Sequence, residues 1–325
     1  MMNHRVTVPA SPNILRVYEP KYCSGINASE HDLVLRYAPC IVIYGEEAIK
    51  YPPDNDRIGS VVLSEGERGR TQVSVDVSQP ALYFHAKKLN PLDPDDSAVI
   101  QLTYTYWFPS HPHKMFLDVE SGRFEGLTFR VTLYESGDPI IYESVLACGC
   151  FHGAYVNAAV EEAALAMYGK PEEGMEFVIE RNLKDRMPMV IHGVVKERPK
   201  GNVRPILYIE AGTHIFNGMR IASCDAINIE PEEITIYPYK RLENQPGKTR
   251  FLSMFDKNGN VYDAERLESI VLSALGMFKT GHPRQHLLQK INFDEAYLDD
   301  PDLFVNYLRI PPSVWHTHLL QNKGG

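Results

Sequence analysis

Residues 99–108 read Val99-Ile100-Gln101-Leu102-Thr103-Tyr104-Thr105-Tyr106-Trp107-Phe108, and this stretch decides the fold. Isoleucine, leucine and tyrosine share one parity, whereas glutamine, threonine and tryptophan share the other. β-Branched and aromatic side chains at a period of two are typical of a strand on a pleated surface. The stretch therefore predicts a long strand that ends at the segment Pro109-Ser110-His111-Pro112-His113.

The sequence on either side supplies further strands. Residues 126–134 alternate in the same way, residues 135–139 have turn composition, and residues 140–146 form a returning strand, so a hairpin is expected. Other strands are expected at residues 40–44, 71–77, 81–85, 175–180, 189–196, 203–210 and 233–239. Helical spacing occurs at 157–168 and 263–278, and short helices are expected at 302–308 and 313–321.

This order of elements predicts an α+β protein that is rich in β-structure. We expect an antiparallel, sandwich-like core with a few peripheral helices, mostly in the C-terminal third. The 325 residues fit a single large domain, 1–325. Within it the pattern suggests an N-terminal β subdomain at 1–90, a β core at 91–255 and a helical segment at 256–325.

Composition limits the classes of function. The chain has 33 basic and 42 acidic residues and a formal charge of −9, which argues against a nucleic-acid partner. No apolar run approaches the roughly 18 to 20 residues that span a bilayer, and the first residues show no secretory-signal pattern. Glycine-rich nucleotide motifs and serine-hydrolase and zincin motifs are absent, so no nucleotide cofactor is expected. A small-molecule substrate or ligand remains as the expected partner.

Five cysteines occur in the chain, and they are Cys23, Cys40, Cys148, Cys150 and Cys224. An odd number without a secretory signal favours free thiols in a reducing compartment. A cytoplasmic location is therefore expected.

The first candidate for chemistry is Cys148-Gly149-Cys150-Phe151-His152, at the exit of the expected hairpin. Thiolate and imidazole are ligands for Zn and Fe, and three donors fall within five residues. Two readings compete with a metal site: Cys148 and Cys150 are small buried hydrophobic residues, or they form a redox pair. His152 is a stronger candidate ligand than either thiol.

Two further candidates lie elsewhere. His214 follows the expected strand 203–210, and loops beyond strand ends often carry functional residues, although a loop histidine bonded to the backbone is an equal alternative. Glu125 has the parity of Leu127, so it is buried if the strand reaches it. A buried carboxylate must be paired, protonated or bound to a metal. Asp118 and Arg130 are close in sequence, and we expect them to position a substrate.

The remaining histidines carry weaker signals. His111 and His113 flank Pro112, and a solvated loop is the favoured interpretation. His192 has apolar neighbours and is expected to be an ordinary core histidine.

A resemblance joins several of these segments. The segments Trp107-Phe108-Pro109, Gly126-Leu127-Thr128 and Cys148-Gly149-Cys150-Phe151-His152 form a series similar to one in a family of uncharacterised bacterial proteins, and the resemblance covers the middle third of the chain. It implies no activity. A fainter similarity to Vps62-like proteins involves residues 105–108, Glu125-Gly126 and Gly212-Thr213-His214. That similarity implies a β-rich fold in which Glu125 and His214 come close together.

Three functions follow from these patterns. The first is a metal-dependent enzyme that holds Fe or Zn through His152, His214 and possible thiolate ligands, with Glu125, Asp118 and Arg130 as catalytic residues. The second is a non-catalytic binding protein in which Tyr104, Tyr106 and Trp107 line a cleft and the cysteines are structural. The third is thiol redox chemistry at the paired cysteines.

Overall fold

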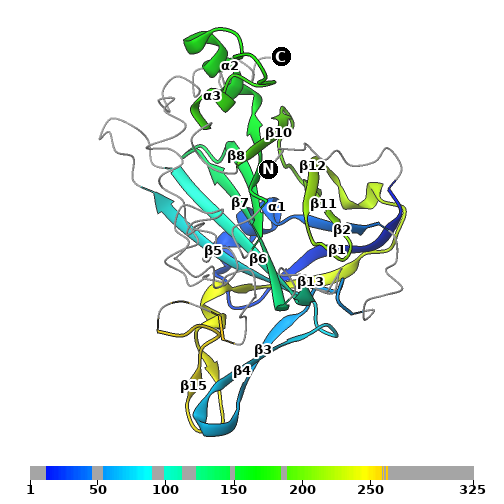
Figure 1. Ribbon diagram of the computed structural model, residues 1–325, viewed down its shortest axis with the longest axis vertical. Helices are drawn as coiled ribbons and strands as arrows, with labels where there is room; N and C mark the ends of the chain where they lie inside the picture. Colours follow the sequence, from blue (N-terminus) through cyan, green and yellow to red (C-terminus); the bar gives the residue numbers. More distant parts are fainter. Residues whose placement is uncertain are drawn as a thin grey trace, which may run out of the picture.

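The computed structural model describes residues 12–45, 54–89, 99–111, 122–146, 151–183, 189–257, 259 and 261–262. One eleven-stranded sheet dominates this part of the chain (Figure 1). Its strands in spatial order are β10 (Val190–Val195), β9 (Gly153–Asn157), β8 (Pro139–Leu146), β7 (Gly122–Leu133), β6 (Val99–His111), β5 (Ala81–Leu89), β13 (Glu232–Pro238), β1 (Ile14–Cys23), β2 (Cys40–Tyr44), β11 (Val203–Glu210) and β12 (Phe216–Ser223). Most neighbouring strands are antiparallel, and the pairs β9–β10, β5–β13, β1–β13 and β2–β11 are parallel.

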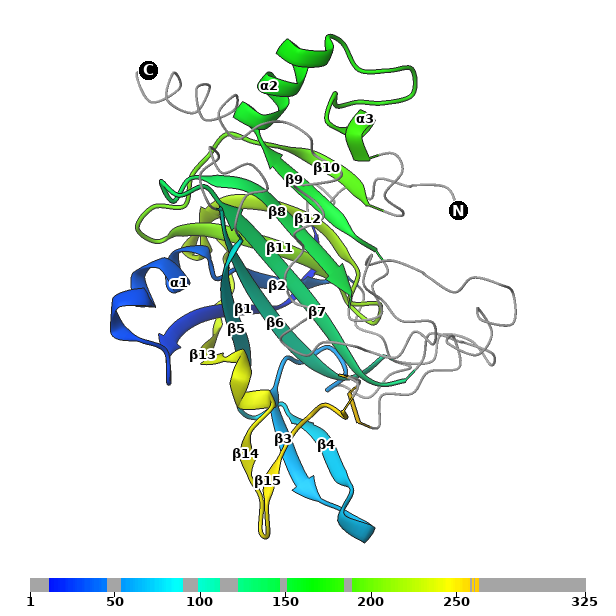
Figure 2. The ribbon, with the colours of Figure 1, turned by 90° about the vertical axis from the view of Figure 1, so that its left-hand side faces the viewer.

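Smaller elements surround this sheet. The two-stranded sheets are β3 (Ser60–Glu65) with β4 (Thr71–Asp76), and β14 (Gln245–Pro246) with β15 (Phe251–Leu252). The helices in the described residues are α1 (His31–Tyr37), α2 (Ala158–Tyr168) and α3 (Glu180–Leu183), with short 3-10 helices at Ala28–Glu30, Glu67–Gly69, Cys224–Ala226 and Tyr239–Leu242. Figure 2 shows α2 and α3 at one end of the sheet and the β3–β4 hairpin projecting from the other. The predicted β-rich fold, with a mostly antiparallel sheet and few helices, is confirmed.

The strand predicted at 99–108 is the start of β6, and it pairs with β7 over most of its length. Thr105 lies opposite Thr128, and Phe108 lies opposite Glu125. The strand continues past Pro109 to His111, beyond the predicted end. The register of the pairing with β7 is the same on both sides of the proline. Phe108 pairs with Glu125 before it, and Ser110 pairs with Arg123 after it.

The sheet has an inner face and an outer face. The inner face carries the largest hydrophobic cluster, which includes Leu102, Tyr104 and Phe129. The outer face is the opposite one, where Trp107 packs with residues of the β3–β4 hairpin. Side chains alternate between the two faces because successive Cβ atoms of a strand point in opposite directions.

The sheet is nearly closed. Its edge strands β10 and β12 do not pair directly, but the hydroxyl of Tyr155 in β9 accepts a hydrogen bond from the amide of Met219 in β12, at 3.2 Å. His192 of β10 also meets Phe216 of β12 edge to face, with ring centroids 5.6 Å apart. Side chains of β9 and β10 thus contact β12 across the gap between the two edges of the sheet.

The helix predicted at 157–168 is confirmed as α2. The side chain of Asn157 accepts a hydrogen bond from the amide of Ala159 at 2.9 Å, which caps the helix. The strand predicted at 175–180 is wrong. Backbone amides of Val178 and Ile179 donate to the carboxylate of Glu161 instead of to a neighbouring strand, and α3 follows. The helices predicted at 263–278, 302–308 and 313–321 lie outside the described residues.

A disulfide joins Cys40 of β2 to Cys224 just after β12, with the Cα atoms 6.3 Å apart. The prediction of free thiols is therefore wrong for these two residues, because the fold brings together positions that are 184 residues apart in sequence. Cys23 is free. The thiol count no longer supports a cytoplasmic location, which stays a prediction. Among the described residues, no helix has the length and apolar character needed to cross a membrane.

Candidate metal centre

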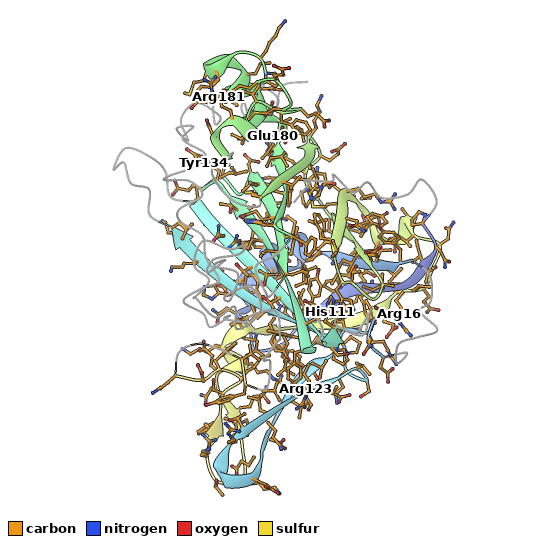
Figure 3. The ribbon with its side chains drawn as sticks, in the orientation of Figure 1. Arg16, His111, Arg123, Tyr134, Glu180 and Arg181 are labelled. Carbon is orange, nitrogen blue, oxygen red and sulfur yellow. A yellow bond between two sulfur atoms is a disulfide. The ribbon has the colours of Figure 1, made fainter. Side chains whose placement is uncertain are left out.

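Three buried side chains meet at one end of the sheet. His111 ends β6, Glu125 lies near the start of β7, and His214 lies in the turn between β11 and β12. Each offers one potential ligand atom, and these atoms all lie within 4.8 Å of one another. The side chains are 4%, 0% and 0% exposed. Figure 3 labels His111 at the end of the sheet from which the β3–β4 hairpin projects. We call these three residues the metal group.

Both imidazoles of the metal group turn toward the same carboxylate oxygen. Nδ1 of His111 contacts Oε2 of Glu125, and Nδ1 of His214 lies 3.8 Å from that oxygen. Glu125 is fully buried opposite Phe108, so its prediction as a buried carboxylate within the strand is confirmed. The expectation that Glu125 and His214 lie close together is also met by this geometry.

The turn between β11 and β12 holds His214 in a fixed place. Gly212 has φ = 75° and His214 has φ = 52°, so the chain reverses through two left-handed residues. The amide of His214 donates to the carbonyl of Glu210 at 2.9 Å, and the hydroxyl of Thr213 donates to the carboxylate of Glu210 at 2.5 Å. The imidazole stacks on the ring of Phe108 with centroids 3.8 Å apart and planes at 4°.

Asp56 orients His214 from the opposite side. Its Oδ1 lies 3.2 Å from Nε2 of His214 and also accepts a hydrogen bond from the amide of Gly212 at 2.6 Å. The segment around Asp56 is tied to the end of β6, because Ser110 donates to the side chain of Asn55 at 2.5 Å. A carboxylate that holds the outer nitrogen of a histidine is the usual support of a metal ligand.

The hydrogen bond to Asp56 decides where the proton of His214 sits. A carboxylate can only accept, so Nε2 of His214 carries the proton and Nδ1 presents a lone pair toward Oε2 of Glu125. That Nδ1 atom is buried and makes no hydrogen bond among the described residues. Two electron-rich atoms that face each other in a buried site need a cation or a second proton between them.

The pKa values of His214 and Asp56 also indicate that positive charge is favoured between His214 and Glu125. Burial lowers the pKa of His214, but the neighbouring carboxylates of Asp56 and Glu125 more than offset it, so the pKa is raised overall. The pKa of Asp56 is lowered, because the hydrogen bonds from His214 and Gly212 outweigh the opposing effect of burial. The site thus favours a positive charge, whether a proton or an ion, at the position between Glu125 and His214.

Two imidazole nitrogens and one carboxylate oxygen form a donor set that suits Zn or Fe. Zn catalytic sites use three such protein ligands and keep a fourth position open, and two histidines with one carboxylate form the facial set of non-haem Fe(II) sites. Ligand distances of roughly 2.0–2.2 Å place neighbouring donors a little over 3 Å apart, and the 3.8 Å between Nδ1 of His214 and Oε2 of Glu125 is close to this value. Nδ1 of His111 contacts Oε2 directly, so the His111 side chain must move away from Glu125 for the donor set to admit an ion.

His152 and Arg130 lie apart from the metal group. His152 Nε2 and Arg130 Nη2 both lie 2.8 Å from Oε1 of Glu143, and all three residues are at most 2% exposed. We call these residues the ion-pair group. Arg130 is five positions from Glu125 along β7 and has the opposite parity, so it lies on the outer face while Glu125 lies on the inner face. The structure therefore brings neither Arg130 nor His152 to Glu125 and His214.

The other predicted site residues, Asp118, Cys148 and Cys150, lie outside the described residues. Sequence reasoning missed His111 and Asp56. The interpretation of His111 as a solvated loop residue rests on ending the strand at Phe108, whereas the observed strand is three residues longer and includes His111. Asp56 gives no local signal, since its partner His214 is 158 residues away.

Strained backbone conformations occur beside or within the metal group and the ion-pair group. The described residues other than glycine with positive φ are Phe124, Phe151 and His214, at 64°, 52° and 52°. Phe124 precedes Glu125, Phe151 precedes His152, and His214 belongs to the metal group. Such conformations cost free energy and cluster at functional sites.

Comparison of the chain with known protein families, curated proteins and solved structures finds no match.

Proposed function

We propose that this chain is a metal-dependent enzyme whose ion, Zn or Fe, is bound by His111, Glu125 and His214. One observation carries the proposal: two histidine Nδ1 atoms turn toward a single oxygen of a fully buried carboxylate. A lone pair and a negative charge held together in a buried site are stabilised by a cation. The absence of sulfur from this group favours neither metal over the other.

Three protein ligands would leave coordination positions for a substrate. If bound there, Zn would supply Lewis-acid chemistry and Fe would supply redox chemistry to a substrate held at those positions. The chain's own residues orient and shield the site. Asp56 fixes the proton on Nε2 of His214, and Phe108 stacks on the same ring and keeps bulk water from it.

The metal content of protein purified without an affinity tag tests this proposal. Elemental analysis should find close to one Zn or Fe per chain, and His214→Ala and His111→Ala should lose it. His152→Ala is the matched control, because His152 is an equally buried histidine paired with another carboxylate. It should keep the metal.

If the purified chain holds no Zn or Fe and takes up neither ion when it is added, the positive charge beside Glu125 is a proton on His214. The proposal fails in that case. It also fails if His152→Ala loses the metal as fully as His214→Ala does.

A further inference from the structure

Three buried hydroxyls on the inner face have no hydrogen-bond partner among the described residues. They belong to Tyr106 of β6 and to Tyr142 and Ser144 of β8. Tyr106 is 0% exposed, and the other two are 1% exposed. A buried hydroxyl that forms no hydrogen bond costs free energy, so three of them on one face of the sheet require an explanation.

The fold pairs the comparable hydroxyls around them. Tyr104 donates to the carbonyl of Val34 at 2.9 Å, and Tyr155 accepts from the amide of Met219 at 3.2 Å. Tyr18 accepts from the amide of Ile58 at 3.3 Å. Tyr104 and Tyr106 are two residues apart on the same strand and in the same hydrophobic cluster, yet only Tyr104 is satisfied by the protein. The lack of a hydrogen-bond partner is thus a property of Tyr106, Tyr142 and Ser144 and not of every buried hydroxyl nearby.

These positions extend from the metal group along the inner face of the sheet. The ring of Tyr106 meets Phe108 edge to face at 6.0 Å, and Phe108 stacks on His214. Ser144 lies opposite Phe129, whose ring stacks on Tyr142 at 6.2 Å. Aromatic and aliphatic side chains lie between the hydroxyls. Among the described residues on the inner face of β6, β7 and β8, Glu125 is the one buried residue with a charged side chain.

We propose that this inner face binds an uncharged, flat, largely apolar molecule whose oxygen atoms accept hydrogen bonds from Tyr106, Ser144 and Tyr142. The aromatic surroundings suit a flat apolar body, and the scarcity of buried charged side chains on these three strands disfavours an ionic one. Arg198 and Glu197 act electrostatically on Tyr142 but not on Tyr106. Burial raises the pKa of both phenols well above the ordinary value, so they stay protonated donors. That this molecule is the substrate of the metal group rests on the proposed function, whereas its binding does not.

Binding of 2-naphthol, an uncharged aromatic alcohol whose single oxygen can accept from the hydroxyl of Tyr106, tests the inference. Equilibrium dialysis of the full chain should show saturable binding of about one molecule per chain. Tyr106→Phe removes one donor and should weaken binding about five- to tenfold, the loss expected for one hydrogen bond. Tyr104→Phe is the matched control and should bind as the wild type does, because its hydroxyl is already used by Val34.

Unfolding in urea gives a second readout on the same variants. Tyr106→Phe should leave the midpoint unchanged or raise it, and Tyr104→Phe should lower it. The inference is overturned if the wild type shows no saturable binding, if both variants weaken binding alike, or if both lower the midpoint alike. Metal content of the same samples separates the two proposals. Bound 2-naphthol without metal contradicts only the proposed function, and metal without bound 2-naphthol contradicts only this inference.

Discussion

The metal group and the ion-pair group place similar side chains in opposite surroundings. Each has a glutamate on β7 or β8 that is at most 1% exposed and that a buried histidine contacts. In the ion-pair group Arg130 lies 2.8 Å from Glu143 and supplies a permanent positive charge. In the metal group a second imidazole, that of His214, takes the place that Arg130 has beside Glu143.

This difference shows what each carboxylate requires. An arginine is protonated at every physiological pH, so Glu143 and Arg130 neutralise each other within the protein. An imidazole whose outer nitrogen donates to Asp56 is neutral unless a second proton is added. Glu125 therefore sits where a cation from outside the chain would complete the balance of charge. The ion-pair group is expected to stabilise the fold, and the metal group to bind an ion.

Removing the arginine should have the largest effect. Arg130→Met leaves Glu143 buried without its permanent counter-charge, and the free energy of unfolding should fall by about 3–5 kcal/mol in urea denaturation. The double variant Arg130→Met/Glu143→Leu should recover most of the loss, because it removes both charges. A fall below about 1 kcal/mol for the single variant would show that Glu143 does not depend on Arg130.

Neutralising the glutamate of each group should separate binding from stability. Glu125→Gln removes the charge that faces both imidazoles, and its affinity for Zn should fall by on the order of 100-fold or more, since changes to residues that only support a ligand already cost roughly 10- to 100-fold. Calorimetric titration of the metal-free chain measures this. Glu143→Gln should bind Zn as the wild type does, and equal losses in both variants would end the distinction between the groups.

A smaller effect is expected at Asp56. Asp56→Asn keeps the size of the side chain but weakens its hold on Nε2 of His214, so the affinity for Zn should fall roughly 10- to 100-fold with unchanged stoichiometry. Asn55→Ala is a useful neighbour for comparison, since Asn55 bonds to Ser110 and not to His214. If both substitutions change the affinity equally, Asp56 acts only by holding its segment in place.

The smallest effect should appear in the pH dependence of the metal-free chain. The raised pKa of His214 means that its proton stabilises the folded state, and this contribution is fully present below the unfolded value of about 6.5. It is lost as the pH rises through the folded-state pKa. Urea midpoints should therefore fall above pH 6.5 in the metal-free chain and less in His214→Gln. Added Zn should reverse the fall, because metal and proton compete for Nδ1.

The hairpin of β6 and β7 could be predicted from sequence because its signal is local. Alternation of side chains along 99–108 and 126–134 indicates strands without any knowledge of distant residues. Glu125 was also within reach, since its parity places it on the buried face. The eleven-stranded order was not, because strands such as β1 and β13 pair across more than 200 residues.

The composition of the metal group could be predicted only in part. His214 and Glu125 were recognised from the sequence. Whether His111 or His152 lies beside them depends on the residue at which β6 ends and on the face of the sheet toward which the side chains of β8 and of the residue before β9 point. The short spacing of Cys148, Cys150 and His152 favoured His152, but the structure places His152 beside Glu143 and away from Glu125 and His214, because closeness in sequence is a poor guide to closeness across a sheet. The division into subdomains and the roles of the two cysteines stay predictions.

Anomalous diffraction from crystals grown with Zn shows directly whether His111, Glu125 and His214 bind the ion. We expect one strong peak about 2.0–2.2 Å from Oε2 of Glu125 and from a ring nitrogen of both His111 and His214. We also expect the ion-pair group to remain intact, with no peak beside Glu143. A peak at Glu143 and His152, or none within reach of Glu125, would contradict this assignment of the ligands.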